Sequence, residues 1–119
     1  YMIINILGTE YTITLRKYRE DASFQSLGIS GYSDDCTKQL VICEMATHPE
    51  YEHENPDVTE CVQKETIRHE IVHAFFSESG LSDSSNPTLG AWAKNEEMVD
   101  WFALQGPKIY RAWEEAGAL

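Results

Sequence analysis

The sequence has few basic residues and lacks long apolar runs. Nine of its 119 residues are Lys or Arg, against 20 Asp or Glu, and the formal net charge is −11. Binding to nucleic acid through phosphates requires clustered positive charge, so the composition argues against a nucleic-acid partner. No run reaches the roughly 18 apolar residues of a transmembrane helix, so we predict no membrane partner. The acidity itself is typical of a soluble protein.

The chain also lacks paired cysteines. Cys36, Cys43 and Cys61 are odd in number, and none of them is spaced C-x-x-C with another. This excludes a disulfide scaffold and predicts reduced thiols in a cytoplasm. Residues 2–7 are apolar, but no basic segment precedes them and no small-residue cleavage site follows. We therefore predict a strand there rather than a signal peptide.

Three apolar segments in the N-terminal half have the alternation or the β-branched content of strands. They are residues 2–7, 11–15 and 38–44. The turn signal at 8–10 joins the first two into a predicted β-hairpin. Between the strands, 16–35 is expected to be mostly loop, with a short helix possible at 21–27, and 45–55 is also read as loop. The expected sheet is three-stranded and mostly antiparallel.

The C-terminal half has the periodicity of helices. Asn55-Pro56-Asp57 is a helix start, and the apolar spacing continues until Gly80 stops the helix. After a polar connector at 81–90, a second helix is predicted over 92–105, beginning near Asn95. Gly106-Pro107 should break it before a short third helix at 108–116. Strands followed by helices predict an α+β domain spanning 1–119.

The second half of the long helix contains His69-Glu70-Ile71-Val72-His73, which reads H-E-x-x-H. Residues four apart lie on one helix face, so both imidazoles can bind one Zn²⁺. Glu70 lies about 100° around the helix, where it misses the metal but can act as general base on a water. The alternative is a solvated polar stripe. The apolar neighbours, including Ala74 and Phe75, argue against it, because an unpartnered histidine among them would be costly.

Catalytic zinc requires a third protein ligand and an open position. Glu96 is a candidate, with Asp100 four residues later to accept a hydrogen bond from a ligating histidine. Spacing alone leaves Glu97 as an equal rival. Glu78 and Asp83 are weaker candidates, because the chain has barely turned by then.

Other polar residues have weaker signals. His48 and His53 are read as surface histidines. A hydrolase also needs a hydrogen-bond donor for the developing oxyanion. The sequence leaves four candidates open for that role: Tyr32, His48, Tyr51 and Tyr110.

Two stretches carry a resemblance to a known family. Residues 69–75 read His-Glu-Ile-Val-His-Ala-Phe, and residues 96–103 read Glu-Glu-Met-Val-Asp-Trp-Phe-Ala. Together they resemble the ImmA/IrrE-type metallopeptidases, which are small gluzincins. The resemblance implies a zincin-like domain with an edge strand beside a two-helix core, and it makes Glu96 the third ligand. It also implies a stand-alone phage or prophage protein in a bacterial or phage-infected cell.

The leading hypothesis is therefore a zinc metallopeptidase that hydrolyses a protein or peptide substrate. We expect an extended substrate segment to pair with strand 38–44. A zinc-stabilised regulatory or protein-binding module without turnover is the alternative. An acidic mimic of nucleic acid is a weaker third reading, because it gives the metal motif no role.

Overall fold

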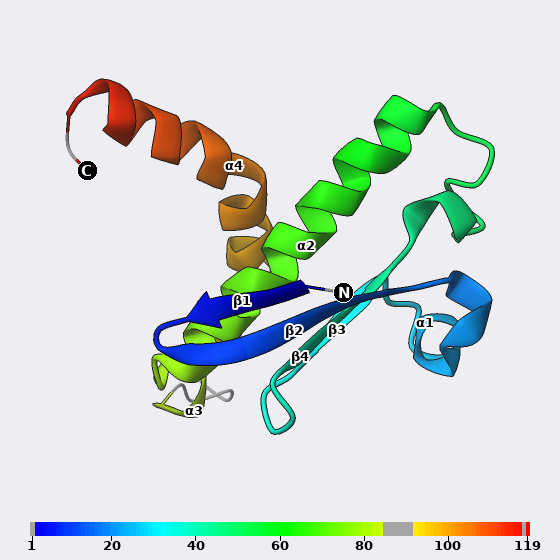
Figure 1. Cartoon of the computed structure of the whole chain (residues 1–119), viewed down its shortest axis with the longest axis horizontal. Coiled ribbons are helices and arrows are strands. Elements are labelled where there is room, and N and C mark those ends of the chain that lie inside the picture. The colour runs from blue at the N-terminus through cyan, green and yellow to red at the C-terminus, as the bar shows by residue number, and fades with distance from the viewer. Residues whose placement is uncertain (1, 85–91, 118) are drawn as a thin grey trace.

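The computed structural model describes residues 2–84, 92–117 and 119. Strands and one short α-helix come first, and two long helices follow with another short helix between them (Figure 1). The elements are β1 (Met2–Ile6), β2 (Thr9–Arg16), α1 (Ala22–Ser26), β3 (Gly31–Asp34), β4 (Gln39–Cys43), α2 (Pro56–Glu78), α3 (Leu81–Ser84) and α4 (Glu96–Glu115). Short 3-10 helices lie at Tyr18–Glu20, Met45–Thr47 and Trp92–Lys94. The predicted α+β class is confirmed.

The sheet has four strands in the order β1-β2-β4-β3. The outer pairs are antiparallel, and the central pair of β2 and β4 is parallel. The predicted three-stranded layout was therefore wrong, because β3 lies in the segment expected to be loop. Gly31 belongs to that predicted loop. It begins β3 instead, where an added Cβ would lie 3.1 Å from the Val41 carbonyl oxygen and 3.3 Å from Cγ of Glu70. A close approach of this kind is a known reason for glycine in a strand.

The two faces of the sheet are covered by different parts of the chain. Successive residues of a strand point to opposite faces, so Leu40 and Ile42 pack with Ala74 of α2, while Val41 packs with Phe24 of α1. The Phe24 side also holds a buried polar group. Asp21 accepts hydrogen bonds from the Tyr32 hydroxyl (2.7 Å) and from Arg16 (2.8 Å). The Tyr32 hydrogen bond is the main reason that the pKa of Asp21 lies below its ordinary value.

Helix α2 begins and ends where the sequence predicts. The Asn55 side chain accepts a hydrogen bond from the backbone N–H of Asp57 at 2.8 Å, and Pro56 occupies the first helical position. At the other end Gly80 adopts a φ of 83°, the left-handed conformation that glycine takes readily after a helix. The predicted connector 81–90 opens with the short helix α3, and its residues 85–90 lie outside the described part of the chain.

Helix α4 starts as predicted but does not break at Gly106-Pro107. The Asn95 side chain accepts from the N–H of Met98 at 2.9 Å, and the helix then continues without interruption to Glu115. Proline at 107 removes the N–H that would bond the Ala103 carbonyl four residues earlier. Arg68 of α2 supplies the missing donor, with its Nε 2.5 Å from that oxygen. A donor from outside the helix therefore satisfies the carbonyl that the proline leaves free, and the helix continues through it.

Candidate metal centre

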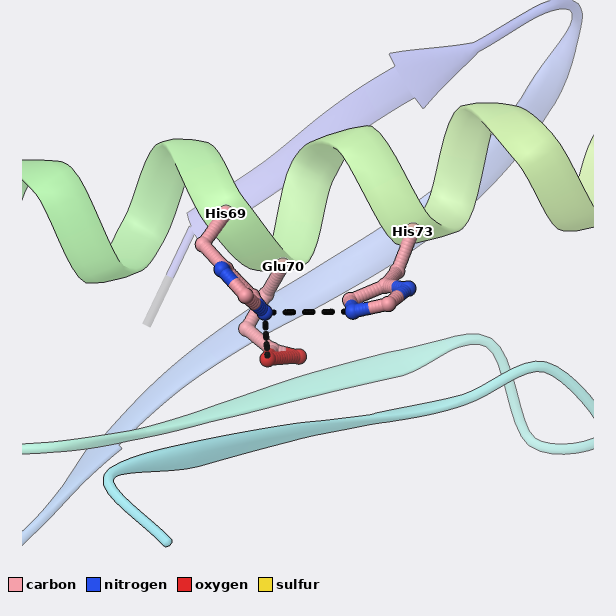
Figure 2. Close-up of side chains that lie close together, drawn as sticks. All are labelled: His69, Glu70 and His73. Carbon is pink, nitrogen blue, oxygen red and sulfur yellow. Dashed lines mark hydrogen bonds and ion pairs between the residues drawn. The ribbon is translucent and has the colours of Figure 1, made fainter. Parts of the chain in front are cut away.

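Helix α2 presents His69, Glu70 and His73 on one side, toward strands β3 and β4 (Figure 2). The Nε2 atoms of the two histidines are 3.1 Å apart, and Oε1 of Glu70 lies 3.8 Å from Nε2 of His69. The spacing of four residues places both imidazoles on one helix face, where they meet edge-on with ring centroids 4.8 Å apart. The ligand atoms of the three residues lie within 4.8 Å of one another, so the group can hold a metal ion.

The first turns of α4 add two carboxylates to this group. Oε2 of Glu96 lies 3.1 Å from Nε2 of His69, and its Oε1 lies 3.1 Å from Nε2 of His73. On the outer side, Nδ1–H of His69 donates to Oδ1 of Asp100 at 2.5 Å. Among the described residues that line this site Glu96 and Asp100 are present and Glu97 is not. The structure thus brings together His69, Glu70, His73, Glu96 and Asp100, and leaves the rival ligands Glu97, Glu78 and Asp83 outside the lining of the site.

The chemistry of the donors fits a zinc ion. Ligands bound at about 2.0–2.1 Å in a tetrahedron lie about 3.3 Å from one another. Nε2 of His69, Nε2 of His73 and Oε2 of Glu96 are separated by 3.1 Å, 3.1 Å and 3.3 Å, which is close to that value. Because Asp100 accepts the Nδ1 proton of His69, the neutral ring turns its Nε2 lone pair toward His73 and Glu96. Two imidazole nitrogens and a carboxylate are the ligand set of many catalytic zinc sites.

Glu70 is the most deeply buried carboxylate at this site, with 5% of its surface exposed. Burial raises its pKa to about 7, partly opposed by the nearby His69 and reinforced by the Glu96 carboxylate. Gly31 of β3 makes room for its side chain, since a Cβ there would press on Cγ of Glu70. A carboxyl group with a pKa near neutrality is suited to both accepting and releasing a proton.

The site opens into a cleft of about 800 Å³ between β3, α2 and the start of α4. Sequence reasoning missed most of its walls. Ser30, Gly31 and Ser33 were assigned to a loop, and no local signal placed them opposite the H-E-x-x-H motif. Glu65 and Ser77 also line the cleft. Their positions four residues before His69 and four after His73 could have revealed them, because these residues share one helix face.

The other candidate ligands lie away from the site. Glu78 accepts from Nζ of Lys38 at 2.6 Å and from the Tyr11 hydroxyl at 3.2 Å, and Asp83 is exposed in α3. His53 is exposed as predicted, with 92% of its side chain accessible. His48 is half-buried instead, because its ring packs edge-on against Tyr18 with centroids 4.9 Å apart.

The tyrosines nominated as oxyanion donors differ in their environment. Tyr32 and Tyr51 both line the cleft, whereas Tyr110 lines a separate groove between α2 and α4. The Tyr32 hydroxyl donates its proton to Asp21, so this proton is already used and is not free for an oxyanion. Tyr51 is the remaining tyrosine among these candidates at the cleft.

Comparison of the chain with protein-family models, with curated proteins and with solved structures found no match. None of the helices in the described part of the chain is both long enough and apolar enough to cross a bilayer.

Proposed function

We propose that this protein is a zinc-dependent metallopeptidase of the gluzincin type, similar to the ImmA/IrrE group. The observation that carries the proposal is the convergence of His69, His73 and Glu96, whose donor atoms lie 3.1–3.3 Å apart and line an open cleft. A purely structural zinc site has four protein ligands and is closed, whereas a catalytic site keeps one position open. Three protein ligands facing a cleft favour the catalytic arrangement.

The residues around the ligands have separate roles in the proposed reaction. A zinc ion held there supplies a Lewis acid that lowers the pKa of a coordinated water and polarises the substrate carbonyl. Glu70 takes a proton from the attacking water and returns it to the leaving amine, which suits its pKa of about 7. Asp100 holds the proton on Nδ1 of His69, which keeps Nε2 free for the metal.

We propose that the substrate binds as an extended segment along β3. The expected pairing with residues 38–44 does not fit the fold, because β4 lies between β2 and β3. Strand β3 is at the edge of the sheet and passes close to Glu70, since a Cβ added at Gly31 would lie 3.3 Å from Cγ of Glu70. An edge strand offers free backbone donors and acceptors to a peptide, so main-chain pairing gives affinity without strict sequence selectivity.

The test compares zinc-loaded wild type with Glu70→Gln on a mixed-sequence peptide library, with cleavage products identified by mass spectrometry. We expect the wild type to cleave and Glu70→Gln to be slower by about 100-fold or more while still binding zinc. Glu60→Gln is the matched control, because Glu60 is an exposed carboxylate on the same helix, paired with Lys64. Equal cleavage by wild type and Glu70→Gln would contradict the role of Glu70. A zinc-loaded wild type that cleaves nothing would favour the non-catalytic binding module.

A further inference from the structure

A second feature joins the two helices of the site, and it depends on Pro107. In an α-helix, the backbone N–H of residue 107 would donate a hydrogen bond to the carbonyl of Ala103, four residues earlier. Proline has no N–H, so this hydrogen bond is missing. The oxygen is bonded instead by Nε of Arg68 at 2.5 Å, from the neighbouring helix. A carbonyl that would normally accept a hydrogen bond within its own helix therefore accepts one from α2.

This contact lies next to a metal ligand along α2 and shares a helix face with the site residues of α4. Arg68 immediately precedes His69 on α2. On α4, Ala103 lies three residues after Asp100 and seven after Glu96, so the three share one helix face. Each residue turns the helix by about 100°. A rotation of α4 by one residue would therefore move Glu96 away from the histidines and bring Glu97 toward them.

Besides Arg68, the site residues themselves make directional contacts between the two helices, since Asp100 bonds Nδ1 of His69 and Glu96 lies beside both histidines. Glu96 and Asp100 are exposed, with 67% and 63% of their side chains accessible. Val99 and Ala103 are buried on this part of α4, but their apolar contacts are non-directional. A hydrogen bond from a charged guanidinium to a single carbonyl is directional and short. The hydrogen bond from Arg68 can therefore fix the rotation of α4 about its axis, which the burial of apolar side chains alone does not determine.

We propose that Arg68 is a positioning residue that fixes the register of α4 against α2 and so selects Glu96, rather than Glu97, for the metal. Pro107 makes this possible by leaving the Ala103 carbonyl free. The inference rests on the proposed zinc site. It gives Arg68 a role that the H-E-x-x-H motif does not include.

The first experiment measures zinc affinity by competition with a chromophoric chelator. We expect Arg68→Met to weaken zinc binding by about tenfold or more, as for other residues that orient metal ligands. Arg68→Lys, which keeps a cationic donor, should lose less. Arg111→Met is the matched control and should bind as wild type, because Nε of Arg111 donates to the Pro107 carbonyl within its own helix at 3.2 Å.

The second experiment separates positioning from stability. Pro107→Ala restores an N–H that can bond the Ala103 carbonyl within α4. In the double variant Arg68→Met/Pro107→Ala we therefore expect the melting temperature to recover while zinc affinity stays low. The double variant also provides a folded protein if Arg68→Met alone does not fold.

The results distinguish the inference from the proposal beneath it. If the double variant regains both stability and zinc affinity, Arg68 only satisfies a carbonyl and the positioning role is wrong. Equal zinc affinity of wild type and Arg68→Met also overturns the inference, while leaving the zinc site intact. A wild type that binds no zinc overturns both.

Discussion

The two helices contribute to the candidate metal centre in different ways. On α2, the side chains of His69 and His73 are 19% and 22% exposed, and Glu70 is buried. On α4, Glu96 and Asp100 have about two thirds of their side chains accessible. One half of the site is thus embedded in the fold, and the other half reaches it from the surface.

The difference follows from what each helix packs against. Helix α2 lies on the sheet, where Ala74 joins the core cluster and Ile67 and Ile71 pack against it. Helix α4 contacts mainly α2, and Figure 1 shows its C-terminal half leading away from the sheet. The α2 residues are therefore held in place by the core. The α4 residues are held by their own contacts with His69 and His73, by the Arg68 hydrogen bond and by the burial of Val99 and Ala103.

The largest expected effect comes from removing the α4 ligand. Glu96→Gln should weaken zinc binding by more than about 100-fold, because it removes an anionic ligand and not only a group that supports one. Glu97→Gln removes the same charge one residue later and should bind zinc as wild type. Isothermal titration of both variants with zinc checks this. A loss confined to Glu97→Gln would reverse the assignment of the third ligand.

The burial of Glu70 on α2 can be tested by measuring how the free energy of unfolding of the metal-free protein depends on pH. Its pKa is raised from the ordinary value of 4.5 to about 7, so the folded state binds more protons than the unfolded state between these values. Stability should therefore fall as pH rises through this window and level off above it. The full difference corresponds to at most about 3–4 kcal/mol, at about 1.4 kcal/mol for each pH unit.

Glu70→Gln removes this titration and should be more stable than wild type at pH 7.5 in the presence of a chelator. Urea unfolding of both proteins at pH 5 and pH 7.5 measures it. Equal stability of the two proteins at pH 7.5, together with equal pH dependence, would show that burial does not destabilise the Glu70 carboxylate.

A smaller effect is expected at Asp100, which links the two halves. Asp100→Asn keeps the shape of the side chain but removes the charge that holds the proton on Nδ1 of His69. Zinc affinity should fall by about 10- to 100-fold. Zinc competition assays measure the change, and Asp83→Asn, on an exposed acid of α3, serves as the control. An Asp100→Asn variant with unchanged affinity would remove Asp100 from the site.

Features that depend on local sequence were predicted well. The start of α2 at Asn55-Pro56, its end at Gly80, and the start of α4 at Asn95 follow from capping chemistry within a few residues. The proximity of His69 to His73 follows from the helical repeat alone. That Glu96 and not Glu97 lies beside them was indicated only by the resemblance, since the choice depends on how α4 is rotated.

Features that depend on distant parts of the chain were missed. Glycine ordinarily weakens a strand, and the close approach of the Val41 carbonyl oxygen and of the Glu70 side chain explains the place of Gly31 in β3. The parallel pairing of β2 with β4 was also missed, because the hairpin signal concerns only the neighbouring strands β1 and β2. Pro107 predicts a helix break on local grounds, and the donor that compensates for it, Arg68, is 39 residues away in the sequence. No pattern confined to a short window contains these relationships.

The most direct test of the account is the zinc content of the purified protein. After loading and removal of free metal, elemental analysis should find one zinc per wild-type chain and almost none in a His69→Ala/His73→Ala variant whose circular dichroism still shows a folded protein. The same zinc content in the wild type and in the double variant, or none in either, would contradict a metal centre built on His69 and His73.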